Sequence, residues 1–418
     1  MSAAEPAESG ALRPLHRDRN FALFWAGQTL SALGDAFGLI AVPLLVLEIT
    51  GSLAMMGLVT ALHGVGSLIA GIFGGPIVDR ADRRKLMIRC DLARFVLYLL
   101  IPLGWLLFGP QLWLVFAVTV LGAGLQMVFG IGYITAVANL VDRSRITEAN
   151  GRLGASYSLA FALGPVLAGL VASRFGAAAA IGVDAFTFLA SAASLGMIQL
   201  RRAAAVRPED DGGRRQEFLA GVTFLFATPL FRWLTFITGG MAFFATGIHD
   251  LLIYYVKQDL AQPPQVVGLV FGVASIGAIA SGLLLARMRR SLGYGVCYVG
   301  GLLLQGAALL LIGVAPAVAI IAALATVSAF GDATRGMLTM TLRQELTPDH
   351  LLGRVTAAFW TIFSVPGPLG ALALTQFGER VGTPVALSVA GAFVAALGIL
   401  ALFSPMNARE PLHARPAE

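Results

Sequence analysis

Residues 75–86 read Gly-Pro-Ile-Val-Asp-Arg-Ala-Asp-Arg-Arg-Lys-Leu and lie between two long apolar segments. Only 12% of the chain is charged, so this cluster of charges predicts a place where two membrane spans leave the bilayer and turn. Asp79 can accept hydrogen bonds from the backbone at a neighbouring helix start, where the helix dipole favours an anion. Arg83, Arg84 and Lys85 are expected to hold the loop among anionic lipid headgroups.

The composition of the whole chain indicates a membrane protein. Its 418 residues are 57% hydrophobic, with a mean hydropathy of +0.81, whereas soluble domains are about 25% charged. Too little polar surface remains to solvate a soluble protein of this size. The excess of basic over acidic residues (29 against 23) does not indicate nucleic-acid binding, because the arginines sit in short loops without interleaved aromatics.

Apolar segments long enough to cross about 30 Å of hydrocarbon, about 20 residues each, predict an all-α membrane protein with twelve transmembrane helices. The predicted spans are 20–48, 53–78, 87–108, 111–140, 147–173, 178–200, 230–256, 264–286, 292–313, 316–344, 351–377 and 381–404.

Basic residues crowd alternate connections between these spans, whereas the other connections carry only Arg174, Lys257 and Arg380. By the positive-inside rule, both tails are predicted to be cytoplasmic, in a multi-pass protein of the cell membrane. An even number of spans requires both tails on one side as well.

The domain organisation follows from the longest break in hydropathy, at 201–217, which reads as a flexible linker. Residues 216–228 after it are mildly amphipathic and are expected along the interface. The predicted parts are an N-terminal tail (1–19), a six-helix bundle (20–200), the linker (201–217), a second bundle (218–404) and a C-terminal tail (405–418).

The two halves of the sequence also repeat. Gly151–Arg152 aligns with Gly353–Arg354, and the pairs Gly164–Pro165 and Gly367–Pro368 follow. The repeat favours a duplicated six-helix unit.

The charged stretch resembles the signature loop of the major facilitator superfamily, Gly-x-x-x-Asp-Arg-x-x-Arg-Arg/Lys. The matching positions are Gly75, Asp79, Arg80, Arg83, Arg84 and Lys85; Asp82 stands where the family usually places glycine. The resemblance implies two pseudo-symmetric bundles around a midplane cavity. It also implies a gating loop that latches one side of the protein closed.

Further motifs are similar to one branch of that superfamily, the macrolide-efflux and siderophore exporters. They are Leu-Gly-Asp at 33–35, Asp-Leu-Ala-Arg at 91–94 and Val-Asp-Ala-Phe-Thr-Phe at 183–188. The spacing of Gly151, Gly164, Pro165 and Gly169, with alanine for glycine at 160 and 168, resembles the antiporter motif of drug exporters and implies export. The alternative is that glycine and proline are common in membrane helices.

Ionisable residues inside the spans are costly there and usually face a partner or water. Asp35, mid-span, is the main candidate for a proton-titrating carboxylate; the alternative is a structural hydrogen bond to another helix. Arg94 is expected to be structural, with a place in the cytoplasmic charge cluster as one option. Asp332 and Arg335, three residues apart, are expected to neutralise each other, and they too are proton-coupling candidates. Asp184 and the pair His249–Asp250 either guard an outer gate or are solvated, and Asp184 is also a proton-coupling candidate.

Polar and aromatic residues within the spans are candidates for lining a cavity that takes a bulky amphipathic substrate, although aromatics on spans usually face lipid or other helices. The candidates are Gln126, Tyr133, Tyr157, Phe161, Phe243 and Trp360. Many drug–proton antiporters carry an arginine in the fourth span, and 111–140 has none. Proton coupling is therefore less firmly predicted than transport.

The sequence carries no signal for an enzyme. It contains no Gly-x-x-x-x-Gly-Lys-Ser/Thr loop, no His-Glu-x-x-His and no Cys-x-x-Cys, so neither direct use of ATP nor a metal or other cofactor is expected. Cys90 and Cys297 are expected to be free thiols.

The prediction is a monomeric secondary transporter whose partners are a small-molecule substrate, protons and the lipid bilayer. It is expected to export an amphipathic drug, such as a macrolide, in exchange for protons by alternating access. Alternatives are a siderophore or lysolipid exporter of the same fold, or a membrane sensor on a transporter scaffold.

Overall fold

The computed structural model describes residues 15–199 and 211–410, and within these ranges the chain forms helices and no strand. Twelve of its helical segments are long and apolar enough to cross a membrane, which confirms the predicted number. The first six helices are α1 (Arg19–Thr50), α2 (Leu53–Arg80), α3 (Arg83–Phe108), α4 (Leu112–Leu140), α5 (Ile146–Phe175) and α6 (Ala177–Met197). The remainder are α7 (Asp211–Ala227), α8 (Pro229–Tyr254), α9 (Pro264–Leu292), α10 (Tyr294–Ile312), α11 (Val318–Leu346), α12 (Asp349–Ser364), α13 (Pro366–Val381) and α14 (Thr383–Leu402).

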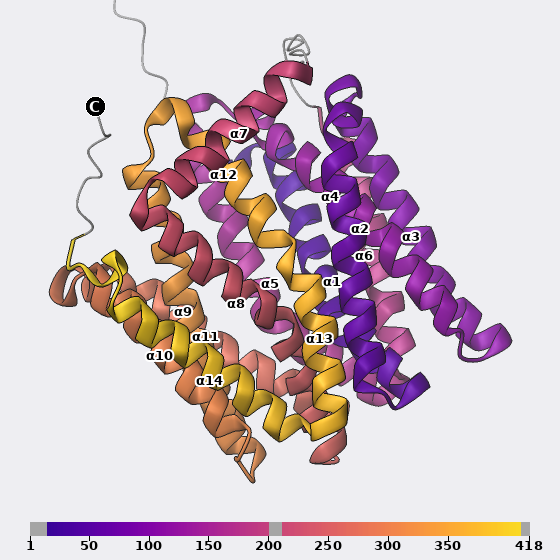
Figure 1. Ribbon diagram of the computed structural model, residues 1–418. Helices are drawn as coiled ribbons and strands as arrows, with labels where there is room; N and C mark the ends of the chain where they lie inside the picture. Colours follow the sequence, from indigo (N-terminus) through magenta and orange to yellow (C-terminus); the bar gives the residue numbers. More distant parts are fainter. Residues whose placement is uncertain (1–14, 200–210, 411–418) are drawn as a thin grey trace, which may run out of the picture.

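The helices form two bundles, which Figure 1 shows side by side. In the first bundle, α1 packs on α5 and α6, α2 on α4, and α3 on α4 and α6. In the second bundle, α9 packs on α11, α10 on α11 and α14, and α8 on α13. This arrangement repeats the six-span unit that the sequence repeat predicts.

Two predicted spans depart from a continuous α-helix. The span predicted at 351–377 is divided into α12 and α13 at Val365–Pro366, because proline lacks the N–H that would continue the helical ladder and its ring clashes with the preceding turn. The seventh span continues beyond α8 as the π-helical turn η3 (Tyr255–Asp259). The break in α12–α13 lies where that span reaches the other bundle.

Side chains at the helix ends explain the short turns. Asp18 caps α1 by accepting from the Phe21 N–H at 3.0 Å, and Gly51 ends α1 with a left-handed φ of 65°. Asp82, the departure from the family pattern, caps α3: its Oδ1 accepts from the Lys85 N–H at 3.1 Å. A carboxylate at this position satisfies a backbone donor that glycine would leave free.

The connections outside the spans are partly helical. Residues 200–210 of the predicted linker lie outside the described residues, and α7 begins at Asp211, within the last part of that linker. It packs along α12. Residues 1–14 and 411–418 of the tails also lie outside the described part. The described tail segments form the 3₁₀ turns η1 (Leu15–Arg17) and η4 (Pro405–Asn407), and another such turn, η2 (Arg143–Arg145), precedes α5.

The two bundles meet tightly near one end of the molecule. We call the end where α1 begins and α14 ends the terminal end, and the opposite end, where α1 passes into α2, the far end. In the far half, a Cβ added at Gly64 of α2 would lie 3.0 Å from Cβ of Pro368, and one added at Gly268 of α9 would lie 3.0 Å from the Pro165 carbonyl carbon. Both repeated Gly–Pro pairs thus lie at contacts between the bundles.

A carboxylate of the second bundle also reaches across at the far end. Glu379 of α13 accepts from the Ala54 N–H at 2.7 Å and from the Ser52 hydroxyl at 2.8 Å. It therefore caps the first turn of α2, where an anion is favoured by the helix dipole. These contacts hold the far end closed.

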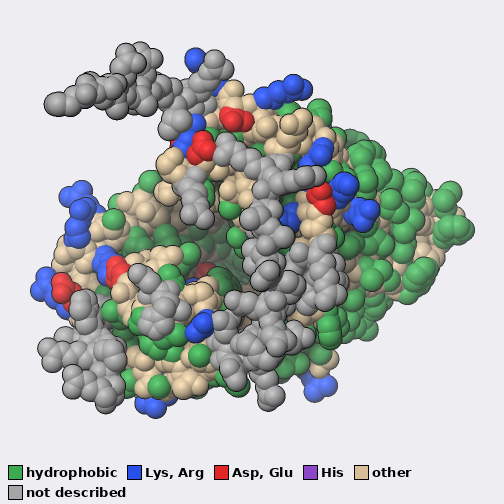
Figure 2. Space-filling model, turned by 90° about the horizontal axis from the view of Figure 1, so that it is seen from above, with side chains coloured by type: hydrophobic (Ala, Val, Ile, Leu, Met, Phe, Trp, Pro, Cys, Tyr) green, Lys and Arg blue, Asp and Glu red, His purple; other side chains and the backbone are tan. Residues whose placement is uncertain are grey.

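The terminal end is open by contrast. Figure 2 views this end and shows the molecule hollowed between the bundles, with Lys and Arg side chains around the hollow. The structure is therefore closed at the far end and open at the terminal end.

Substituting Gly268 by alanine should disfavour closure of the far end, because the new methyl group would meet backbone atoms of Pro165 and Gly169 that cannot rotate away. The expected cost is about 1–3 kcal/mol, as for overpacking of a close-packed interior. Gly282→Ala on the same helix is the matched control, since no atom lies within 4 Å of its added Cβ. Thiol-labelling rates of cysteines placed along the far-end seam measure the effect; equal rates in the two variants would contradict it.

Candidate functional site

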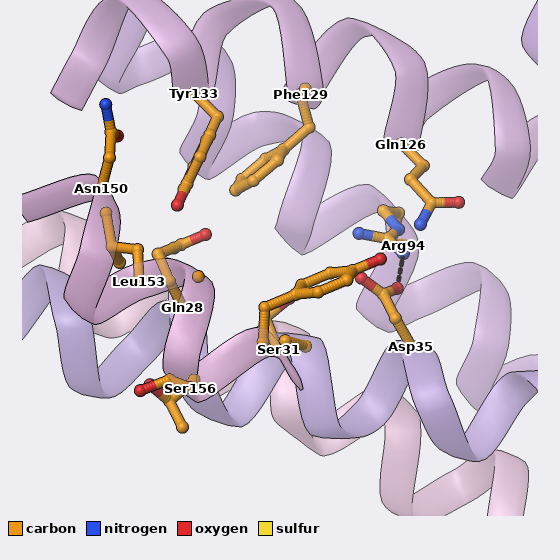
Figure 3. Close-up of a pocket in the computed structure, with 15 residues that line it drawn as sticks. Gln28, Ser31, Asp35, Arg94, Gln126, Phe129, Tyr133, Asn150, Leu153 and Ser156 are labelled. Carbon is orange, nitrogen blue, oxygen red and sulfur yellow. Dashed lines mark hydrogen bonds and ion pairs between the residues drawn. The ribbon is translucent and has the colours of Figure 1, made fainter. Parts of the chain in front are cut away.

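A cavity of about 380 Å³ lies within the first bundle, and residues of α1, α3, α4 and α5 line it (Figure 3). Its lining comprises Gln28, Thr29, Ser31, Ala32, Asp35, Arg94, Gln126, Phe129, Gly130, Tyr133, Asn150, Leu153, Gly154, Ser156 and Tyr157. The volume lies within the range of sites that bury drug-sized ligands, about 300–1,000 Å³.

One polar stripe on α1 forms a wall of the cavity. Gln28, Ser31 and Asp35 follow one another at helical spacing, so their side chains share one face of a mainly apolar helix. Gln28 also donates to the Ser191 hydroxyl of α6 at 3.0 Å. Sequence analysis singled out only Asp35; the i, i+3, i+7 spacing of polar residues was the signal that could have found the other two.

Asp35 forms an ion pair with Arg94 of α3, at 2.5 Å between Oδ1 and Nη2. The Arg94 side chain is 2% exposed and that of Asp35 is 23% exposed, so the carboxylate faces the cavity and the guanidinium lies behind it. The guanidinium also stacks over the Phe188 ring of α6, 3.7 Å from its centroid. The option that Arg94 belongs to the cytoplasmic charge cluster is therefore wrong.

Two more carboxylates are buried close to this pair. Asp91 lies 4.0 Å from the Arg94 guanidinium and is fully buried, with no hydrogen-bond partner for either oxygen among the described residues. Asp184 of α6 is 1% exposed and packs against α1 beside Gly34. The option that Asp184 is solvated is therefore wrong, because the small residue at 34 lets α6 place its carboxylate against α1. Three carboxylates thus surround one guanidinium.

Aromatic and amide side chains line the opposite side of the cavity. Of the candidates from the sequence, Gln126 and Tyr133 of α4 and Tyr157 of α5 line this cavity. Phe161 stacks on Tyr157 with ring centroids 4.3 Å apart and lies outside the lining. Phe243 and Trp360 belong to the second bundle and do not line this cavity. The cavity therefore joins flat apolar faces to hydrogen-bonding groups.

The predicted pair Asp332–Arg335 forms at 2.7 Å on α11. Gln305 of α10 donates to the same carboxylate at 3.4 Å. The pair lies in the second bundle and does not line the cavity of the first. Sequence spacing was sufficient to find this contact because both partners share one helix face.

The glycine-rich helix α5 lies between α1 and the other bundle. Gly164 packs against Ala36 of α1, and a Cβ added at Gly169 would lie 2.6 Å from the Pro264 carbonyl oxygen of α9. Gly151, by contrast, is exposed and has open space around it. Close packing therefore involves Gly164, Pro165 and Gly169 but not Gly151.

The charged loop is a two-residue turn between α2 and α3. The surroundings of Gly75 and the side chains of Asp79 and Arg80 lie outside the described part of the structure. Arg84 donates through Nε to the Leu195 carbonyl at 2.7 Å and through Nη2 to the Gly196 carbonyl, so it caps the end of α6 rather than facing headgroups. Lys85 is exposed.

Arg94→Ala should destabilise the protein by about 3–5 kcal/mol, because it leaves buried carboxylates without their cation. Arg152→Ala, which removes a half-exposed partner of Glu148 (3.1 Å), should cost less than about 1 kcal/mol. Unfolding titrations in mixed micelles compare the two variants. Equal free energies of unfolding would show that the ion pairs of Arg94 contribute no more to stability than the ion pair of Arg152.

Comparison with known proteins agrees with this fold and with transport. The chain is 25% identical over 414 residues to the multidrug efflux pump Tap of Mycolicibacterium fortuitum, covering 94% of this chain and 97% of Tap. It is 29% identical over 378 residues to the enterobactin exporter EntS of Salmonella typhimurium, covering 87% and 86% of the two chains. Both relatives are transporters and not enzymes.

Solved structures show the same fold at low identity. A bacterial homologue of the iron transporter ferroportin, in an inward-facing state, superposes with a TM-score of 0.74 at 18% identity, covering 94% of this chain and all of that one. The nucleoside transporter NupG (D323A mutant) gives 0.73 at 11% identity, covering 92% and 99%. The sequence profile of the Major Facilitator Superfamily matches residues 24–371. With twelve spans in two bundles and this match over most of its length, the chain belongs to the Major Facilitator Superfamily.

Proposed function

We propose that this transporter exports an amphipathic small molecule, such as a macrolide drug, in exchange for protons. The efflux pump and the siderophore exporter among its relatives support export. The observation that carries the proposal is the position of Asp35, which faces the cavity and pairs with a buried arginine behind it.

The charge balance around Asp35 supports proton exchange. An unpaired ion inside a membrane is costly, and Asp35, Asp91 and Asp184 share the single guanidinium of Arg94 in the described part of this cluster. Asp35, which is 23% exposed, is the member that water in the cavity reaches. Binding a proton there reduces the excess negative charge, and a substrate that occupies the cavity competes for the same carboxylate.

The cavity lining supports an amphipathic substrate. The rings of Phe129, Tyr133 and Tyr157 offer flat apolar contacts, and Gln28 and Gln126 offer amide groups. Aromatic faces with a few placed polar groups are typical of drug-sized ligand sites. Siderophore export is the second candidate, favoured by the likeness to the enterobactin exporter; a lysolipid substrate and a sensor role are weaker alternatives.

Alternating access supplies the transport step. In this proposal the bundles 20–200 and 218–404 rock about the far-end contacts, and the chain works as a monomer. Gly75, Asp79, Arg80, Arg83, Arg84 and Lys85 latch the terminal end when it closes. The close packing at Gly164, Pro165 and Gly169 lets α5 move as a hinge against the other bundle. Asp332 and Arg335 remain secondary candidates for proton coupling.

Asp35→Asn should abolish proton-driven efflux while the protein still inserts, because an amide neither binds the proton nor pairs with the guanidinium as a charge. Flux of a fluorescent macrolide into inside-out vesicles under an imposed pH gradient measures this. Glu148→Gln, an exposed carboxylate at the start of α5, is the control. Unchanged flux in Asp35→Asn would remove this residue from the mechanism.

The positive-inside pattern assigns the terminal end to the cytoplasm. With Cys90 and Cys297 replaced by alanine, a cysteine at Phe108 near the far end should react with a membrane-impermeant maleimide in intact cells. A cysteine at Ser291, at the terminal end, should react only after permeabilisation. Both native cysteines are buried free thiols, so their removal is a small change. The reverse labelling pattern would invert the proposed orientation.

A further inference from the structure

The seam between the bundles contains polar groups that the cavity does not use. On α8, His249 donates through Nε2 to the Leu39 carbonyl of α1 at 3.3 Å. Its ring packs on that of Phe271 of α9, with centroids 4.4 Å apart. The next residue, Asp250, lies near Thr60 of α2. Leu39 and Thr60 belong to the first bundle and the other three residues to the second, so the two bundles meet here.

The seam lies between the cavity and the far end. Thr60 is seven residues from the far end of α2, and Asp250 is nine residues before the end of η3. At a rise of about 1.5 Å per residue, both lie about 10–14 Å from the far end. Asp250 therefore sits in the closed barrier beneath the cavity, at a depth where no headgroup reaches it.

Asp250 is buried there without a cation. It is 1% exposed, and its Oδ2 has no hydrogen-bond partner among the described residues. The sequence alternative that it is solvated is therefore wrong. No ion pair to it forms in the described part of the chain, and Thr60 is a neighbouring polar side chain.

The titratable groups on the helices around Asp250 do not neutralise it. They are His249 on α8, Lys257 and Asp259 on η3, His63 one turn beyond Thr60 on α2, Asp35 and Glu48 on α1, and Glu379 and Arg380 on α13. Lys257, two turns from Asp250, interacts electrostatically with Glu48. Asp35 is paired with Arg94 and Glu379 caps α2, while α9 presents the apolar ring of Phe271. An ionised carboxylate in such a place carries the full cost of lost hydration.

Separation of the bundles at the far end changes this environment. Asp250 is buried near Thr60 of the first bundle, so opening the seam brings water to the carboxylate. In water an aspartate ionises at little cost, whereas in the closed seam the neutral acid is favoured. The same side chain thus has a different preferred charge in the two states of the transporter.

We propose that Asp250 is a second proton-binding site, loaded from the far side each time the far end closes and emptied when it opens. The inference rests on the proposed alternating access, but it concerns a different carboxylate from Asp35. On closure, one proton moves from far-side water to the Asp250 carboxylate; on opening, the same proton returns. No other group changes charge in this step.

The sign of the pH effect follows from this exchange. Where Asp250 is ionised in the open form and protonated in the closed form, closure takes up one proton, so lower pH favours closure. The closed-to-open ratio should then rise by about tenfold for each pH unit of acidification. Asp35, which lies on the cavity wall, is exposed to the opposite compartment while the far end is closed.

The test is a distance measurement on the full chain in nanodiscs. Spin labels at Phe108 in the first bundle and Val314 in the second, both highly exposed near the far end, report opening by pulsed electron resonance. Cys90 and Cys297 are replaced by alanine. The variants are Asp250→Asn, which mimics the protonated acid, and Asp259→Asn, an exposed carboxylate on the same span, as the control, each from pH 5 to 9.

The labelled parent and Asp259→Asn should close at the far end as the pH falls, with a slope approaching tenfold per pH unit. Asp250→Asn should be closed at all pH values. The slope should persist in Asp35→Asn, even where that variant has lost proton-driven flux. A pH-independent distance in the parent, or an unchanged slope in Asp250→Asn, would overturn the inference. Substrate-dependent distances without that slope would overturn it while leaving alternating access intact.

Discussion

The first bundle depends on the contacts that the buried guanidinium of Arg94 makes with three helices. It is 2% exposed, stacks on Phe188 and pairs with Asp35, so it joins α1, α3 and α6 in a place where hydrocarbon offers no hydration. Burial makes the pair expensive to break and gives it a single geometry. The cavity exists beside it because α1 turns its polar stripe, Gln28, Ser31 and Asp35, toward α4 and α5.

The second constraint is the close approach of the bundles at the far end. Gly64 against Pro368 and Gly268 against Pro165 bring helix backbones into contact. Small residues allow this approach. In a membrane the hydrophobic effect does not favour helix–helix contact over helix–lipid contact, so close packing is needed to hold the helices together. Glu379 adds a helix cap across the same end. Closure therefore combines close packing with hydrogen bonds, which water can replace when the bundles separate.

Two buried acids then differ in a way that matters for transport. Asp35 has a cation and faces the cavity, whereas Asp250 has no ion pair in the described part of the chain and lies in the seam. In the proposed mechanism, Asp35 exchanges a proton with water in the cavity, whereas water reaches Asp250 only when the seam opens. In the state that the structure shows, the cavity site exchanges with the terminal side. The cavity site meets the far side after the bundles rock, whereas the seam site exchanges only with the far side.

The sequence alone determined the twelve spans, the two-bundle repeat and the Asp332–Arg335 pair, because hydrocarbon thickness sets span length and residues three apart share a helix face. It also indicated Asp35, Gln126, Tyr133 and Tyr157. Only the tertiary structure decided that Arg94 meets Asp35, fifty-nine positions away. The burial of Asp184 and Asp250 and the placement of Phe243 and Trp360 outside the cavity were also tertiary outcomes. Periodicity shows which face of a helix is polar, but which other helix that face meets depends on how the bundles pack.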